Sequence, residues 1–331
     1  MNALATEQLP WHQVPWEMLS IARHSDRLPH ALLLVGNAGL GKWQFAQQLA
    51  HSLLCHSSDQ SGHPCCSCQS CHLFNAGTHP DLQKIIPDPE SKSGDIRIDD
   101  IRQMSNKEAL TAQAGGYKVI LIHPAERMTA AAANSLLKTL EEPTAQTRII
   151  LVSSYPHRLP ATIRSRCQQI RFTAPAKEEA TQWLQQQGVT SGAETLLGLS
   201  GGSPLAALAL SQPEIIQERD QQLAEFLALA KGQADLTTVA ARWAKLDQTR
   251  TLTWLSGWLI DIIRLQTADG TVQLFNPDQR EILHTVGKRL KSKLLHQLLE
   301  AVHEARRLAD STLNSQLILE DLLIQWSNGF N

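Results

Sequence analysis

The sequence lacks the features of a membrane protein, of a secreted protein and of a strongly basic nucleic-acid-binding protein. No apolar run approaches the roughly 18 residues that a membrane crossing requires. The first residues do not join a basic flank to an apolar core, so we predict no signal peptide and expect a cytoplasmic protein without a membrane partner. The formal net charge is −2, and any DNA contact would therefore have to be a local patch.

Cysteine is scarce outside one short segment. Five of the six cysteines lie in residues 55–71, and the sixth is Cys167. In a reducing compartment such a cluster indicates a metal site rather than disulfides. Four thiolates can close a tetrahedral site around a structural zinc ion, and two-residue gaps let neighbouring sulfurs turn towards one ion. The predicted zinc ligands are Cys55, Cys65, Cys68 and Cys71.

Other interpretations of this segment stay open. Cys66 is expected to be a bystander. Three nearby histidines are possible substitute ligands: His56, His63 and His72. Cys65 and Cys68 after a proline match half of a zinc-deaminase signature, but the sequence contains no His-x-Glu triplet, which that chemistry requires. A zinc-dependent nucleic-acid reader is another alternative, although residues 55–71 contain no Lys or Arg to contact phosphate.

The length of 331 residues predicts two or three domains. Within residues 31–172, short β-branched runs alternate with helical patterns. This alternation predicts βαβ units and a parallel sheet covered by helices on both faces. The expected strands are 31–35, 82–86, 119–122, 149–153 and 169–172, and the expected helices between them are 42–54, 99–112 and 130–141.

After Pro175 the pattern is helical only. We predict an α/β domain in residues 1–173, a small helical lid domain in residues 174–212 and an all-α bundle in residues 213–331. The helices expected in the lid are 178–187, 194–199 and 203–210. Those expected in the bundle are 215–230, 236–246, 251–266, 277–290, 293–308 and 315–327, with 267–275 as its clearest loop.

Residues 31–43 have the strand–loop–helix order of a phosphate-binding loop. The glycine and lysine positions of the pattern are Gly36, Gly39, Gly41 and Lys42. Glycines let backbone N–H groups curl around an anion, and the helix N-terminus adds partial positive charge. The pattern asks for Ser or Thr as a Mg²⁺ ligand directly after the lysine. Trp43 stands there instead, and an indole cannot ligate Mg²⁺.

A second position also argues against hydrolysis. A motor ATPase needs a carboxylate after a later strand to hold Mg²⁺, but residues 119–122 are followed by His123 and Pro124. Imidazole is a poor ligand for this hard cation. Glu126 could be a displaced carboxylate, although a solvated turn is the favoured interpretation. We predict that this site does not hydrolyse ATP; weak phosphate binding and a purely structural turn both remain open.

Three further stretches, taken with the loop, carry a family resemblance. Residues 133–143 read ANSLLKTLEEP, residues 165–167 read Ser-Arg-Cys, and the third stretch is the cysteine cluster. Together they resemble the AAA+ clamp loader subunits of bacterial DNA polymerase III over nearly the whole chain. The resemblance implies an AAA+ domain with a zinc module inserted at residues 55–71. It also implies that the C-terminal bundle joins a hetero-oligomeric collar.

The resemblance also implies partners and a role for one arginine. The partners would be the gamma/tau and delta subunits, with the sliding clamp and primed DNA reached through the complex. Arg166 would be an arginine finger that reaches the ATP site of a neighbouring subunit. Without the motif, a surface arginine before a strand would be the favoured interpretation. Arg164 is expected to point elsewhere, and Cys167 is expected to be a packed thiol.

The alternative within the family is an active motor ATPase of the gamma/tau type. That type keeps Lys-Thr or Lys-Ser in the loop, Asp-Glu after the strand, and an arginine near Gly-Ser in the lid. Here the corresponding places read Lys42-Trp43, His123-Pro124 and, at residues 202–205, Gly-Ser-Pro-Leu. All three departures favour a non-hydrolysing subunit that is not an enzyme by itself.

Overall fold

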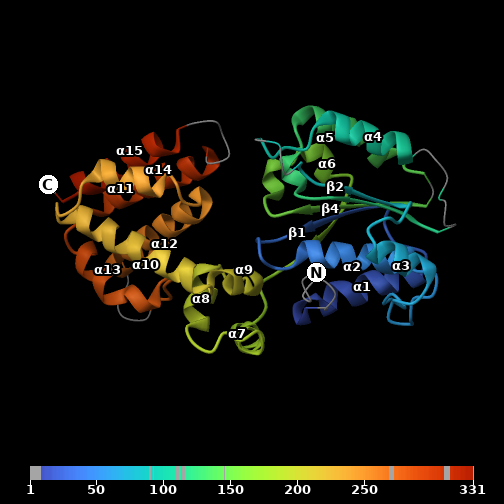
Figure 1. Cartoon of the computed structure of the whole chain (residues 1–331), viewed down its shortest axis with the longest axis horizontal. Coiled ribbons are helices and arrows are strands. Elements are labelled where there is room, and N and C mark those ends of the chain that lie inside the picture. Colours follow the sequence, from blue (N-terminus) through green and yellow to red (C-terminus); the bar gives the residue numbers. More distant parts are fainter. Residues whose placement is uncertain are drawn as a thin grey trace. The chain divides into compact units, whose positions relative to one another are not determined.

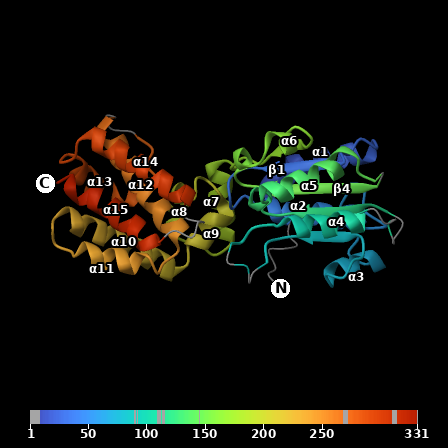
Figure 2. The same ribbon diagram turned by 90° about the horizontal axis from the view of Figure 1, so that it is seen from above.

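The computed structural model of the chain describes residues 9–88, 91, 93–108, 112, 116–144, 146–267, 272–308 and 314–330. It divides into two compact units, Met1–Pro175 and Ala176–Asn331, which Figures 1 and 2 show as ribbons. The first unit is α/β and the second is helical, which confirms the predicted fold class. The finer division into a lid (174–212) and a bundle (213–331) stays a prediction. Among the described helices, none has the length and apolarity that a membrane crossing needs.

The first unit is built on five parallel strands in the order β2-β3-β4-β1-β5. All five predicted strands are confirmed to within two residues. Their bounds are β1 Ala31–Val35, β2 Leu82–Ile85, β3 Lys118–Ile122, β4 Thr147–Ser153 and β5 Gln168–Arg171. Parallel strands end at one edge of a sheet, so the segments that follow β1, β3 and β4 meet at the carboxyl edge.

Helices cover both faces of this sheet (Figure 1). Alternate side chains of the strands point to opposite faces, so Leu32 and Leu34 join one buried core while Leu33 and Val35 join the other. The first core is covered by α1 (Gln13–His24) and α2 (Lys42–Leu54). The second is covered by α4 (Ile98–Glu108), α5 (Ala130–Glu141) and α6 (Ala161–Arg164).

Some elements of the first unit are not among those predicted. Helix α1 follows a short 3₁₀ turn at Pro10–His12, and α3 (Gln69–Asn75) follows the cysteine segment. Two further 3₁₀ turns are Ala125–Arg127 and Pro156–Arg158. Helix α4 ends at Glu108, and of the expected extension to residue 112 only Ala112, outside the helix, lies among the described residues.

The second unit is helical throughout its described part. Its helices are α7 Lys177–Gln186, α8 Ala193–Leu199, α9 Pro204–Leu210, α10 Pro213–Ala230, α11 Leu236–Trp243, α12 Gln248–Thr267, α13 Arg280–Gly287, α14 Ser292–Leu308 and α15 Ser315–Asn328. Large aromatic side chains form the centre of its core. Trp243, Trp258 and Trp326 are fully buried, and the ring of Phe226 stacks on Trp326 with centroids 3.9 Å apart.

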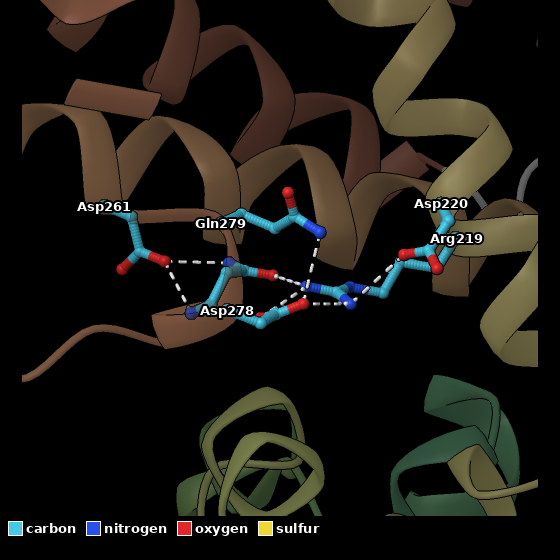
Figure 3. A network of polar contacts seen from close by, with 6 residues as sticks. Arg219, Asp220, Asp261, Asp278 and Gln279 are labelled. Atoms are coloured by element: carbon cyan, nitrogen blue, oxygen red, sulfur yellow. Dashed lines mark hydrogen bonds and ion pairs between the residues drawn. The ribbon is translucent and has the colours of Figure 1, made fainter. Parts of the chain in front are cut away.

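A polar network lies beside this core (Figure 3). Arg219 on α10 is 5% exposed and makes a bidentate contact with Asp278, with N–O distances of 3.0 and 3.1 Å. Its Nη2 also donates to Asn276 Oδ1 at 2.8 Å. Asn276 in turn donates to the buried carboxylate of Asp261 on α12. Burial raises the pKa of Asp261, and hydrogen bonds from Asn276 and from the backbone of Phe275 oppose that shift. The network therefore joins α10 and α12 through one loop.

Removing the arginine from this network should be costly, because Asp278 and Asn276 would lose their shared cationic partner. We expect Arg219→Ala to lower the free energy of unfolding of the full chain by about 3 kcal/mol, measured by urea unfolding followed by far-UV circular dichroism. The matched control is Lys231→Ala at an exposed site. A loss no larger than that of the control would contradict this account.

Candidate functional site at the carboxyl edge of the sheet

The glycines of the phosphate-loop pattern lie between β1 and α2, and the fold itself requires two of them. Gly36 and Gly41 have φ values of +148° and +80°. A Cβ on Gly36 would lie 2.3 Å from the carbonyl oxygen of Phe172, and one on Gly41 would lie 2.4 Å from Leu9 Cδ1. The loop conformation therefore has a structural reason that does not involve a nucleotide.

Lys42 is only 4% exposed and points back into its own loop. Its Nζ donates to the carbonyls of Gly36 and Asn37, both at 2.7 Å, and to Ser154 Oγ at 3.1 Å. An ammonium has three N–H donors, so all of them are used within the chain. Burial lowers the pKa of Lys42 to about 8, and the nearby carboxylate of Glu126 opposes that shift.

The two positions that lack metal ligands lie against each other. The indole of Trp43, at the start of α2, stacks on the imidazole of His123, which follows β3. The ring centroids are 4.8 Å apart and the planes differ by 16°. Burial lowers the pKa of His123, so the ring is neutral at pH 7. A flat aromatic pair thus fills the place between the loop and the end of β3.

The structure corrects one expectation at this edge, because Glu126 is not a solvated turn residue. Its Oε1 accepts hydrogen bonds from the backbone N–H groups of Ser154 (2.9 Å) and Tyr155 (3.3 Å). Its Oε2 is buried without a hydrogen-bond partner among the described residues. The carboxylate holds the segment after β4 and influences the charge of Lys42. Sequence reasoning missed this role because the N–H group of Ser154, which donates to Glu126, lies 28 residues further along the chain.

The four predicted cysteine ligands lie together. Their Sγ atoms are all within 4.8 Å of one another, and four of the separations lie between 3.5 and 4.0 Å. A tetrahedron with 2.3 Å metal–sulfur bonds has an edge of about 3.8 Å, so the donor set fits a tetrahedral metal ion such as zinc. Cys66 is exposed and directs its Sγ to the carbonyl of Pro64.

The cysteine segment is fastened to the helices on either side. Trp16 and Ser20 on α1 both donate to the carbonyl of Ser61 at 3.0 Å. His63, one of the possible substitute ligands, stacks on the Trp16 indole with centroids 4.7 Å apart. Ser70 donates to the carbonyl of Leu54, at the end of α2. The segment is therefore bound to the α/β core by contacts other than a metal.

Arg166 lies between α6 and β5, and therefore at the amino edge of the parallel sheet, where β5 begins. Its Nε donates to Glu141 Oε1 at 2.8 Å, its Nη2 contacts the same oxygen, and its Nη1 donates to the carbonyl of Thr162 at 3.0 Å. The side chain is 35% exposed. Cys167 is buried, as predicted, and burial raises the pKa of its thiol to about 12.

A parallel sheet with a glycine loop after β1, an inserted four-cysteine cluster and a helical C-terminal unit define an α/β protein of the phosphate-loop type with a helical second unit. Residues 11–176 match the family model "DNA polymerase III, delta subunit". Residues 213–328 match the model "DNA polymerase III, delta subunit, C terminal". The chain belongs to the family of the delta′ subunits of DNA polymerase III.

Individual relatives match over nearly their whole length. The DNA polymerase III subunit delta′ of Pseudomonas aeruginosa is 35% identical over 96% of this chain and 97% of its own. The subunit delta′ of Escherichia coli is 34% identical over 96% of this chain and 94% of its own. Among solved structures, a gamma subunit-related protein of Thermotoga maritima aligns with 95% of this chain and 100% of its own, at 17% identity and a TM-score of 0.47.

The structure also brings His12 to this site, a residue for which the sequence carried no signal. The ring is fully buried beneath the loop, and its Nε2 lies 2.8 Å from the carbonyl oxygen of Leu40. It packs edge-on against Phe45 and Phe172. Burial lowers the pKa of His12 to about 4, and the contact with the Leu40 carbonyl opposes the shift.

The lowered pKa of His12 should make stability depend on pH. In the unfolded chain the residue takes up a proton near the ordinary histidine pKa of 6.5, and in the folded chain it does so near a pKa of about 4. The free energy of unfolding should therefore fall between pH 6.5 and 4, by about 3 kcal/mol from this residue. We expect His12→Gln to lose less stability than wild type between pH 7 and 5 in urea unfolding. The exposed His24→Gln is the control, and equal pH slopes in wild type and His12→Gln would contradict the assignment.

Proposed function

We infer that this chain is a non-hydrolysing clamp loader subunit of DNA polymerase III, which helps to place the sliding clamp on primed DNA. In this proposal it assembles with gamma/tau and delta subunits. It supplies Arg166 to the ATP site of a neighbouring subunit. The observation that carries the proposal is the Trp43–His123 stack, because it occupies both places where a motor ATPase would hold Mg²⁺.

The chemistry of these residues supports the loss of hydrolysis. Mg²⁺ prefers oxygen ligands in near-octahedral geometry, and neither an indole nor a neutral imidazole supplies an oxygen. Lys42 already donates all three of its hydrogens within the chain. A triphosphate would have to displace these contacts before the lysine could bind it. Whatever phosphate the loop holds is therefore held without a metal at these positions.

The position of Arg166 supports the second half of the proposal. A finger must reach a partner, and this side chain is partly exposed while its backbone is held between α6 and β5. A guanidinium offers two parallel N–H donors to a phosphate. In other phosphoryl-transfer systems such a cation is worth ~10³–10⁵ in rate.

Glu126 is the one observation that favours the alternative, an active motor ATPase of the gamma/tau type. Its Oε2 is a buried oxygen near Lys42 that has no hydrogen-bond partner among the described residues, and it could act as a displaced metal ligand. Phosphate release by the isolated chain with MgATP, lost in both Lys42→Ala and Glu126→Gln, would establish this alternative instead.

The arginine is tested in the reconstituted clamp loader with primed DNA and the sliding clamp. We expect Arg166→Ala to leave assembly unchanged on gel filtration and to lower DNA-stimulated ATP hydrolysis by at least about tenfold, since a finger acts on the transition state. Arg171→Ala, at an exposed end of β5, is the matched control. Wild-type turnover in the Arg166 variant would exclude the finger role.

We further propose that the four cysteines hold a structural zinc ion. A closed Cys₄ set leaves no open position for water, so the ion would stabilise the fold rather than catalyse a reaction. We expect about one zinc per chain by elemental analysis. Cys68→Ser should lose the metal and lower the melting temperature by roughly 5 °C or more, whereas the exposed Cys66→Ser should not. A chain with full stability and no metal would refute this assignment.

A further inference from the structure

The contacts of Arg166 leave a defined part of its guanidinium available. The group has five N–H donors, one on Nε and two on each terminal nitrogen. Glu141 receives one from Nε and one from Nη2, and the Thr162 carbonyl receives one from Nη1. One hydrogen on each terminal nitrogen has no acceptor among the described residues. Two donors are the number that a bidentate contact with a phosphate uses.

We propose that Glu141 is a positioning residue for Arg166, which holds the guanidinium so that its two remaining donors face a phosphate group of the neighbouring subunit's nucleotide. The proposal rests on the finger role of Arg166 proposed above. The new element is that contacts within this chain set the orientation of the Arg166 guanidinium before the subunit binds its neighbour's nucleotide.

Both side chains are attached to a rigid frame. Glu141 is the last residue of α5, and Arg166 directly follows the turn after α6. Leu140 and Ile163, which lie close to them in sequence, are fully buried in the same core. Because the backbones cannot separate, the carboxylate selects one orientation of a long side chain that otherwise has many rotamers. Preorganisation of this kind reduces the entropy lost on reaching the transition state.

The opposite role, in which Glu141 sequesters the arginine, fits the contacts less well. A sequestering carboxylate would have to compete with a polyphosphate. The Glu141 side chain is 50% exposed, so water weakens the ion pair too much for it to withhold the guanidinium from a polyphosphate, although the pair still biases the orientation of the side chain. Nor does the carboxylate cover the two donors that a phosphate needs. The two roles predict rate changes of opposite sign when the carboxylate is removed.

The test is DNA-stimulated ATP hydrolysis by the reconstituted clamp loader containing variants of this chain. We expect Glu141→Ala to lower kcat about tenfold, with KM for ATP changed by less than about twofold, because a misdirected finger weakens the transition state and not substrate binding. Glu141→Gln keeps an oxygen acceptor for Nε and Nη2, so it should stay within about twofold of wild type. The double variant Glu141→Ala/Arg166→Ala should be no slower than Arg166→Ala alone.

The matched control is Glu142→Ala, which removes the neighbouring exposed carboxylate, and assembly of every complex is checked by gel filtration. A higher rate in Glu141→Ala would mean sequestration and overturn the proposal, as would an unchanged rate. If Arg166→Ala slows hydrolysis while Glu141→Ala does not, only the positioning role fails. If Arg166→Ala has no effect, the finger role itself fails.

Discussion

The packing of an indole against a neutral imidazole at the carboxyl edge of the sheet is the constraint on which the interpretation of this protein depends. Trp43 and His123 come from segments 80 residues apart, and each alone would be a simple loss of a ligand. Because they stack, a polar residue introduced at either position alone would leave the other ring without its stacking partner. A metal site at this edge of the sheet would therefore require coordinated changes at both positions.

The same sheet separates two kinds of chemistry. At the carboxyl edge lie the segments that follow β3 and β4, where Lys42 donates to the Ser154 hydroxyl and Glu126 accepts from the Ser154 N–H. At the amino edge, where β5 begins, Arg166 has two guanidinium hydrogens without an acceptor among the described residues. The polar groups of the first region bind within the chain, and those of the second remain available to a partner. This distribution is what a subunit needs if it acts on a neighbour's nucleotide and not on its own.

Much of the fold could be predicted because its signals are local. The buried strands β1, β3 and β4 are short apolar runs between turns, and the cysteine spacing predicted the four sulfurs that lie together. Helix α1 escaped prediction because its pattern is divided. Trp16 and Leu19 are buried, whereas Val14 and Ile21 are 77% and 69% exposed, so no single apolar stripe marks a core face.

The site was less predictable, because its contacts join segments that are distant in the sequence. Glu126 was expected in solvent since its own neighbours in sequence are turn-like, but the N–H groups that it accepts from follow another strand. The Arg166–Glu141 pair spans 25 residues, and the two residues of the pair belong to motifs that the sequence presents separately. Composition and spacing identify such residues as candidates. Which of them contact one another is decided only in the folded chain, where distant segments lie side by side.

The contact between Phe226 and Trp326 has a consequence for the order in which the chain acquires its structure. The indole of Trp326 stacks on the Phe226 ring and donates to the Phe226 carbonyl across 100 positions of sequence. During synthesis on the ribosome, α10 is made about 100 residues before Trp326. Until α15 follows, the Phe226 side of α10 is exposed to solvent or to chaperones. The α/β unit can close early in translation, whereas the helical unit closes only when α15 has been made.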